Sequence, residues 1–239
     1  MVELEDLILK SEKYKNVIIQ KKFDSKKNTV AYVTIDDKPR VLKWFVPGFK
    51  RQMKIEYNIL KKGSTKINIP VIHEIDEENN VIIMSYINGI NLCEILNDEK
   101  TETKEKEKLM HLLSEWFKDF HNFFKTQEQF TIRGDANLRN FIFTDRIWGV
   151  DFEESRTGKP VEDIAGLCSS ILTTNPMFTI EKFRLCDLFI KSYLKLTQEK
   201  IDNINDEIAY ALLEKIQYRP EDEEILRENS KIIKKKGLR

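Results

Sequence analysis

Residues 131–155 read TIRGDANLRNFIFTDRIWGVDFEES, and this stretch decides the fold. Asp135 follows Gly134 in a turn, Asn140 opens the apolar run FIF, and Asp151 follows the second apolar run, IWGV. Short apolar runs bounded by polar residues are typical of buried strands. A polar side chain at the end of such a strand projects away from the core, where its oxygen atoms are available to a ligand.

These oxygen atoms suit a divalent cation. Mg²⁺ prefers carboxylate, amide and water oxygens and commonly shares phosphate oxygens with a nucleotide. Asp135, Asn140 and Asp151 together would hold Mg²⁺ and orient a hydroxyl for attack on a phosphate. Either aspartate alone is better explained as a turn cap, so this hypothesis depends on their joint spacing with a strand lysine, Lys43.

Composition sets the class of protein. The chain has 239 residues, 41% hydrophobic and 33% charged, with a formal net charge of zero, which gives no overall case for nucleic-acid binding. Its three cysteines form no CxxC pair, and the N-terminus MVELEDLILKSEKYK has no apolar signal-peptide core. With no apolar run near ~18 residues, we expect a cytoplasmic protein without a membrane segment.

The first ninety residues are rich in predicted strands. Alternation, β-branched residues and turn residues such as DSKKN and DDKP indicate antiparallel hairpins. An amphipathic stretch that ends at Gly63 indicates a helix. The pattern predicts helices over 4–11 and 49–62 and strands over 16–23, 29–35, 40–46, 67–76 and 80–87.

The remainder is predicted to be mainly helical. Apolar residues recur at helical spacing from Leu109 to Phe124, and we expect this stripe to lie in a core. The charged segment 97–108 is either a loop or the solvated start of that helix. Two short strands are predicted over 141–143 and 147–150. Helices follow over 161–173 and 179–197, with one or two more before the basic tail SKIIKKKGLR.

The segment from Arg133 to Asn140, RGDANLRN, resembles the H-G-D-x-x-x-x-N loop of the protein-kinase-like superfamily, and Val150–Glu153, VDFE, resembles its D-F-G segment. The form with Gly before Asp is similar to aminoglycoside and lipopolysaccharide-sugar phosphotransferases and to the small kinase of the tRNA threonylcarbamoylation machinery. The resemblance implies that Asp135 is the catalytic base and that Asn140 and Asp151 bind Mg²⁺.

The order of the upstream elements extends the resemblance over about residues 20–170. Lys43 in VLK would hold the nucleotide phosphates, with Glu56 in the next helix as its ion-pair partner. The segment MSYINGINL resembles the hinge that faces adenine, which implies cofactor contacts from Met84, Tyr86 and Ile87. The acidic segment Glu162–Ile164 resembles one that holds the loops together in the tRNA-machinery kinase. Taken alone, Lys43 and Glu56 would be ordinary solvated charges.

Three departures from the family pattern stand out. Arg133 replaces the usual His, which changes one contact of the loop, and Glu153 replaces the Gly of D-F-G, which makes that loop less free to flip. The hairpin turn KKFDSKKNTV has no glycine, so the phosphate cover is reduced. Four lysines are candidates to supply charge there instead: Lys21, Lys22, Lys26 and Lys27.

We therefore predict an α+β, two-lobed protein-kinase-like fold. Its N-terminal lobe, residues 1–89, is a small antiparallel sheet with one helix, and its helical C-terminal lobe spans residues 90–239. The expected activity is ATP- and Mg²⁺-dependent phosphoryl transfer to a hydroxyl. Only a short stretch separates Asp151 from the helix near Asp163, which leaves no obvious platform for a peptide.

The favoured acceptor is a tRNA ribose, by resemblance to a small archaeal-type kinase and because the tail from Lys231 to Arg239 is basic. A helix C-terminus that complements its dipole explains this tail equally well. The alternatives are an atypical Ser/Thr protein kinase of the RIO type, a sugar or lipopolysaccharide-type kinase, and a catalytically dead scaffold. Nothing in the sequence indicates an oligomeric state.

Overall fold

The structure, a computed structural model, describes residues 4, 6, 8, 11–25 and 27–238. The chain divides into two compact units. One consists of the residues up to Asn88 together with Asp151–Glu154, and the other consists of Gly89–Val150 with the residues from Ser155 onward. The helix expected over 4–11 lies largely outside the described residues.

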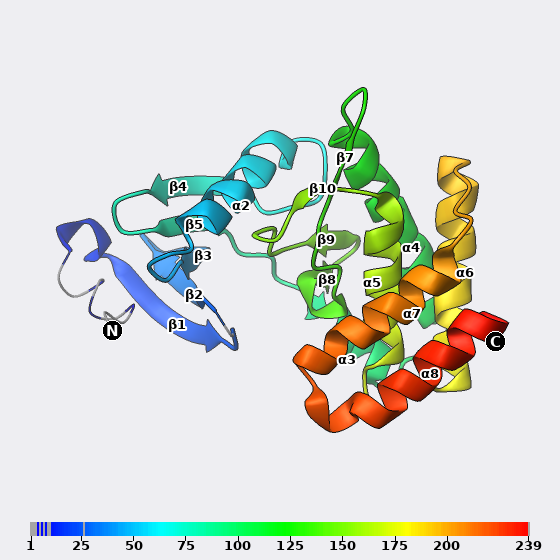
Figure 1. Cartoon of the computed structure of the whole chain (residues 1–239). Coiled ribbons are helices and arrows are strands. Elements are labelled where there is room, and N and C mark those ends of the chain that lie inside the picture. The colour runs from blue at the N-terminus through cyan, green and yellow to red at the C-terminus, as the bar shows by residue number, and fades with distance from the viewer. Residues whose placement is uncertain (1–3, 5, 7, 9–10, 26, 239) are drawn as a thin grey trace. The chain divides into compact units, whose positions relative to one another are not determined.

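The first unit is built on a five-stranded antiparallel sheet with the spatial order β1-β2-β3-β5-β4 (Figure 1). The two-residue turn between β2 and β3 consists of Asp36 and Asp37, both with positive φ (48° and 59°), as the tight turns of twisted hairpins require. The strands are β1 (Val17–Phe23), β2 (Thr29–Ile35), β3 (Lys38–Trp44), β4 (Ile72–Asp76) and β5 (Val81–Ser85).

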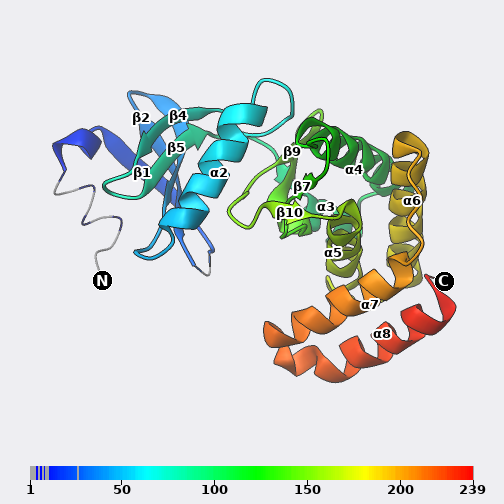
Figure 2. The same ribbon diagram turned by 45° about the horizontal axis from the view of Figure 1, so that its top comes forward.

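One face of this sheet packs into an apolar core, and the other carries a charged side chain. Ala31 pairs with Leu42, and both lie in a buried apolar cluster with Leu4 and Tyr14. The opposite face carries Lys43, since neighbouring strand residues point to opposite sides. Helix α2 (Lys50–Gly63) runs beside the sheet (Figure 2). The core therefore fixes one face of β3 and leaves the other to position a charged side chain.

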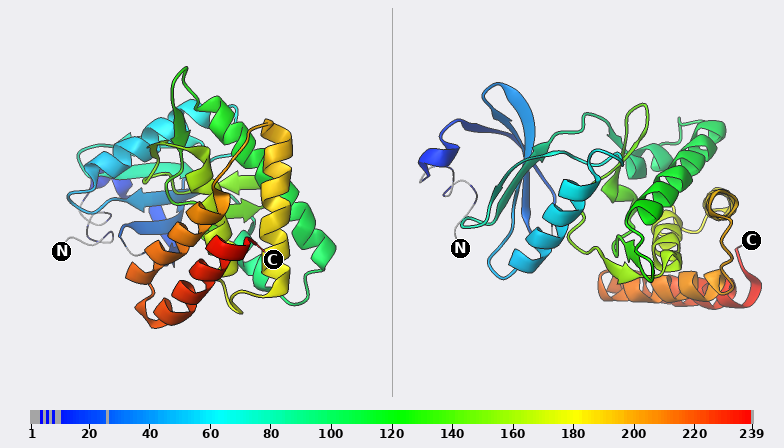
Figure 3. Two further views of the ribbon diagram at one scale, coloured as in Figure 1. Left: turned by 45° about the vertical axis from the view of Figure 1, so that its right-hand side comes forward. Right: turned by 90° about the horizontal axis from the view of Figure 1, so that it is seen from above.

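The second unit is a helical assembly. Helices α4 and α6 lie side by side, as do α7 and α8 (Figures 1 and 3). The helices are α3 (Leu92–Asn97), α4 (Thr103–Phe123), α5 (Pro160–Leu172), α6 (Ile180–Thr197), α7 (Ile204–Glu214) and α8 (Glu223–Lys236). Among the described residues, none of the helices has the length and apolar character needed to cross a bilayer.

The predicted aromatic stripe of α4 is buried through Trp116, Phe117 and Phe120. Phe123 does not belong to this core: it is the last residue of the helix and is 40% exposed. The helix begins at Thr103, so the second half of the charged segment, 103–108, is its first part, and Lys106 within it is buried.

Short strands hold the loops of this unit. Strand β7 (Phe130–Ile132) pairs with β10 (Arg156–Gly158), and β6 (Ile90–Asn91), β8 (Phe141–Phe143) and β9 (Ile147–Gly149) form a second small sheet. Single 3₁₀ turns lie at η1 (Glu12–Tyr14), η2 (Leu138–Asn140), η3 (Lys215–Gln217) and η4 (Pro220–Asp222). The segment from Arg133 to Asn140 thus runs from β7 to β8, and each of these strands pairs with another strand of the same unit.

Candidate active site

Asp135 and Asn140 lie together on the loop after β7. Gly134 has a φ of +76°, which only glycine adopts without strain. Asp135 is exposed, and the Asn140 Nδ2 donates to both the Asp135 carbonyl and its Oδ2, each at 3.1 Å. The Asn140 carbonyl accepts a hydrogen bond of 2.9 Å from Val150 N. The loop thus presents one solvent-accessible carboxylate beside an amide.

A buried carboxylate anchors this loop. The Oδ2 of Asp163 accepts from Arg133 N at 2.7 Å, and its Oδ1 accepts from Gly134 N at 3.1 Å. His121 joins the Asp163 Oδ2 through Nε2 at 3.0 Å and the Tyr193 hydroxyl through Nδ1 at 2.9 Å. Asp163 and His121 are each 1% exposed. His121 is therefore a packed, hydrogen-bonded residue of the loop's support.

Arg133 occupies the place of the family's histidine. It is 1% exposed, and its Nη2 donates to the Val150 carbonyl at 2.6 Å. Its guanidinium lies over the Trp116 and Phe141 rings, at 5.4 and 4.8 Å from their centroids. Such cation–π contacts offset part of the cost of burying the charge. Arg133 therefore holds the residue that immediately precedes Asp151 in the chain.

In the first unit, Lys43 is surrounded by three carboxylates. Its Nζ lies 2.6 Å from Glu56 Oε2, 2.7 Å from Asp151 Oδ1 and 2.9 Å from Glu153 Oε2. The side chains of Lys43, Glu56 and Glu153 are 5%, 1% and 9% exposed, whereas that of Asp151 is 41% exposed. Asp151 is the carboxylate of this cluster that a ligand can reach, and its backbone has a positive φ of 62°.

The electrostatics of the cluster favour a charged lysine. Burial opposes protonation of Lys43, but the negative charges of Glu56, Asp151 and Glu153 outweigh it and raise the pKa of Lys43 above its usual value. Burial also raises the pKa of Glu56, an effect that Lys43 opposes and that the other two carboxylates reinforce. With all groups ionised, the cluster has two more negative than positive charges, which a divalent cation would neutralise.

Glu153 has a further partner. Its Oε2 accepts a hydrogen bond of 2.5 Å from Asn28 Nδ2, and Asn28 Oδ1 accepts from Val46 N at 3.3 Å. Next to them, Lys27 Nζ lies 2.6 Å from Glu154 Oε1, with both side chains more than 40% exposed. The turn between β1 and β2 is thus bonded to the segment that follows Asp151. Lys26, one of the lysines expected over the phosphates, lies outside the described residues.

Of the residues predicted to face adenine, Met84 lies on the same face of the sheet as Lys43. Met84 pairs with Val41, which precedes Lys43 by two residues, and it is 5% exposed. Tyr86 stacks on Tyr32, with ring centroids 4.3 Å apart and planes at 20°. The half-buried Ile87 follows directly.

The basic side chain of Lys215 interacts electrostatically with Asp135. Lys215 is the first residue of η3, and burial lowers the pKa of its ammonium while the negative charge of Asp135 opposes that shift. Within the described part of the chain, the Lys215 ammonium has no hydrogen-bond acceptor. Lys215 is thus a half-buried basic residue whose charge interacts with that of Asp135.

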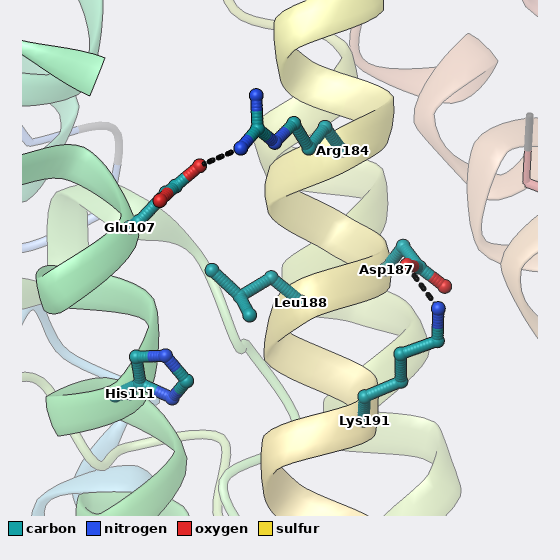
Figure 4. Close-up of a pocket in the computed structure, with 6 residues that line it drawn as sticks. All are labelled: Glu107, His111, Arg184, Asp187, Leu188 and Lys191. Carbon is teal, nitrogen blue, oxygen red and sulfur yellow. Dashed lines mark hydrogen bonds and ion pairs between the residues drawn. The ribbon is translucent and has the colours of Figure 1, made fainter. Parts of the chain in front are cut away.

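The hollow between α4 and α6 is not a candidate site. It is lined by Glu107, His111, Arg184, Asp187, Leu188 and Lys191 (Figure 4). Its charges are paired locally, Arg184 with Glu107 at 2.6 Å and Lys191 with Asp187 at 2.7 Å. None of the predicted catalytic or nucleotide-binding residues lines it.

No protein-family model and no curated protein sequence matches the chain, but solved structures do. An aminoglycoside phosphotransferase in a ternary complex with ADP and hygromycin B superposes with a TM-score of 0.68 and 10% identity, over all of both chains. A phosphotransferase of the same kind, in complex with gentamicin, gives 0.61 and 15% identity, covering 99% of this chain and 97% of the other. A choline/ethanolamine kinase family protein from Mesorhizobium loti gives 0.59 and 13%, covering 90% and 86%.

These likenesses confirm the predicted fold: the chain has the protein-kinase-like fold, with a small antiparallel sheet in one unit and a helical second unit. The predicted site residues fall into two groups. Lys43, Glu56 and Asp151 meet in the first unit, and Asp135 and Asn140 meet in the second.

Sequence reasoning did not assign the roles of Asn28, Glu153 and Lys215. Glu153 was noted only as a replacement for glycine, and its partner Asn28 lies 125 positions away along the chain. Two features of the sequence could have pointed to this contact: the glycine-free turn between Phe23 and Thr29, and the acidic Glu153 in place of glycine. An acid at that position calls for a basic or amide partner.

Proposed function

We propose that the protein is an ATP-dependent phosphotransferase that moves the γ-phosphoryl group to a hydroxyl. The observation that carries this proposal is the meeting of Lys43, Glu56 and Asp151, at 2.6 and 2.7 Å, in a chain with the protein-kinase-like fold. A buried lysine that is held charged by acids is suited to bind phosphate oxygens. Met84, Tyr86 and Ile87 are the proposed adenine contacts.

The acidic groups fit a divalent cation with oxygen ligands. The cluster around Lys43 has surplus negative charge, and Asp151 is accessible. Asp151 and Asn140 would hold Mg²⁺, which supplies charge neutralisation and orientation of the phosphates. Asp135 would accept the proton of the acceptor hydroxyl, because its carboxylate is exposed and oriented by the Asn140 amide. Asp163 holds the loop that presents Asp135.

The proposed acceptor is a small hydroxyl compound with an anionic group. Two of the solved structures named above contain hygromycin B or gentamicin, whose amino groups are positively charged at neutral pH. When protonated, Lys215, whose charge interacts with that of Asp135, would repel such a group and attract a phosphate or carboxylate. Sugar phosphates and acidic sugars have the required combination of hydroxyl and charge.

A tRNA ribose hydroxyl is the second candidate acceptor, since phosphodiesters satisfy the same charge requirement. The basic cluster that favours it, Lys234 to Lys236, lies in the last turn of α8, where it also complements the helix dipole. Lys234 pairs with Asp206 at 3.3 Å. Binding of tRNA that falls steeply with added salt would favour this acceptor, and absence of binding would remove it.

Nucleotide binding separates the enzyme from a kinase-shaped scaffold. A thermal shift is measured with ATP at millimolar concentration, with and without Mg²⁺. Stabilisation of the wild type that Lys43→Met removes supports the proposal, because a ligand that binds only the folded state raises its stability. Absence of any stabilisation by ATP with Mg²⁺ would favour the scaffold. Labelled ATP with sugar phosphates, aminoglycosides, tRNA and protein then identifies the acceptor.

A further inference from the structure

Asn28 lies in the bend directly before β2, whose Val30 is opposite Lys43 in the register. Its side chain is joined to that of Lys43 through the carboxylate of Glu153. Asn28 is only 6% exposed. An amide buried at this position has to find hydrogen-bond partners, and it finds Glu153 and Val46.

A single carboxylate oxygen joins the turn to the lysine. Oε2 of Glu153 accepts from Asn28 Nδ2 at 2.5 Å and lies 2.9 Å from Lys43 Nζ. All three side chains are less than a tenth exposed. Bonds from ionised acceptors in such surroundings are stronger than neutral ones and fix geometry. The path from Asn28 through Glu153 to Lys43 is therefore a rigid connection within the first unit.

The turn connected in this way is the one without glycine, between Phe23 and Thr29. A glycine-rich turn can approach phosphates closely with its backbone N–H groups, and this turn lacks the glycines that make such an approach easy. We propose that Asn28 and Glu153 are positioning residues, which together fix the β1–β2 turn and the Lys43 ammonium for the phosphates of the bound nucleotide. This inference rests on the proposed function, since it concerns the same nucleotide.

The inference reverses the expectation from family consensus. If Glu153 were only a tolerated replacement, Glu153→Gly would restore D-F-G and leave nucleotide binding intact or improved. In this structure the same change removes the acceptor of Asn28 and one counter-charge of Lys43. Glu153→Gly is therefore expected to weaken binding.

The experiment is a titration of a fluorescent ATP analogue with Mg²⁺, well below the melting temperature of each variant. Asn28→Ala and Glu153→Gly are each expected to raise the Kd about tenfold, because each removes a hydrogen bond to a charged group. Glu153→Gln keeps an oxygen acceptor for Asn28 but removes the charge beside Lys43, and its Kd is expected to lie in between. The double variant Asn28→Ala/Glu153→Gln is expected to be non-additive.

Glu77→Gln is the matched control. It makes the same chemical change in the same unit and breaks only an exposed pair with Lys54, which is expected to alter the Kd less than about twofold. Melting temperatures are recorded for all variants. Lower melting temperatures with an unchanged Kd in Asn28→Ala and Glu153→Gly would show a merely structural contact and overturn the inference. If the wild type itself bound no nucleotide, the proposed function would fail instead.

Discussion

The Nζ of Lys43 and the Oε2 of Glu56 lie 2.6 Å apart, joining β3 to α2 through a pair that is almost fully buried. Breaking such a pair leaves an uncompensated charge, which typically costs about 3–5 kcal/mol. Lys43→Met leaves three carboxylates without their shared cation, whereas Glu56→Leu leaves Lys43 with Asp151 and Glu153. Lys43→Met is thus expected to be the more destabilising of the two.

Denaturant unfolding monitored by circular dichroism measures this order. Lys191→Met, which breaks only an exposed pair with Asp187, is the control and is expected to stay within about 0.5 kcal/mol of wild type. Equal stability losses for Lys43→Met and Glu56→Leu would contradict the shared-cation arrangement.

A second prediction concerns the buried support of the loop from Arg133 to Asn140. Asp163→Ala removes the acceptor of two backbone N–H groups and of His121, and each buried group left unpaired costs about 1–3 kcal/mol. We expect a loss of about 3 kcal/mol or more and faster amide exchange at Arg133 and Gly134. Asp187→Ala, at an exposed helix position, serves as the comparison. Unchanged exchange at the two loop amides would refute this role of Asp163.

Two glycines of the second unit are expected to respond in opposite directions. A Cβ at Gly149 would lie 2.3 Å from the Trp116 ring and 2.9 Å from Arg133 Nη1, whereas one at Gly166 would lie 3.6 Å from its nearest neighbour, Ala136 Cβ. Gly149→Ala is expected to cost about 1–3 kcal/mol by overpacking. Gly166→Ala, inside α5, is expected to stabilise by up to about 1 kcal/mol. Thermal unfolding of both variants tests this, and a stabilising Gly149→Ala would be inconsistent with the packing around Arg133.

The lowered pKa of Asp76 predicts how the stability of the protein changes at acid pH. Burial raises the pKa of Asp76, but hydrogen bonds from Asn79, Lys13 and Tyr14 outweigh this and hold it well below its usual range. The folded-state pKa of Asp76 is lower than the unfolded value of about 3.9. The ionised Asp76 therefore makes its full contribution to the stability of the fold above that pH. It is lost as pH falls through the folded-state pKa.

Asp76→Asn should therefore cost about 1–3 kcal/mol at neutral pH and reduce the loss of stability on acidification below about pH 4. Unfolding free energies at a series of pH values measure both effects. If the unfolding free energy of Asp76→Asn fell as steeply with decreasing pH as that of wild type, carboxylates other than Asp76 would be responsible for the acid sensitivity.

The sequence predicted most of the first unit because its signals are local. Alternating apolar residues, the DDKP turn and Gly63 mark β2, β3 and α2 within a residue or two of their observed limits. Lys43 and Glu56 were selected only through resemblance, because a strand lysine and a helical glutamate carry no local sign of pairing. The two-residue strand β6 and the single-turn elements were missed, since two or three residues establish no periodicity.

The role of Glu153 shows why other parts of the site were not predictable. Its two partners, Asn28 and Lys43, are brought to it by the register of β2 on β3 and by the association of residues 151–154 with the sheet. Neither is encoded near Glu153. Lys215 likewise approaches Asp135 only through the packing of the helical unit: Ser170 in α5 bonds Leu138 of the loop, and the adjacent Ser169 bonds Ala211 in α7.

The most direct measurement of the central claim is phosphoryl transfer from γ-labelled ATP by wild type and by Asp135→Ala, with nucleotide affinity measured on the same samples. Asp135 is exposed and its carboxylate accepts a hydrogen bond from the Asn140 amide, so the variant is expected to fold and to bind ATP with Mg²⁺ as wild type does. Loss of a catalytic base predicts a fall in transfer of at least about 10²-fold. Transfer by Asp135→Ala at the wild-type rate, with wild-type nucleotide affinity, would contradict the account.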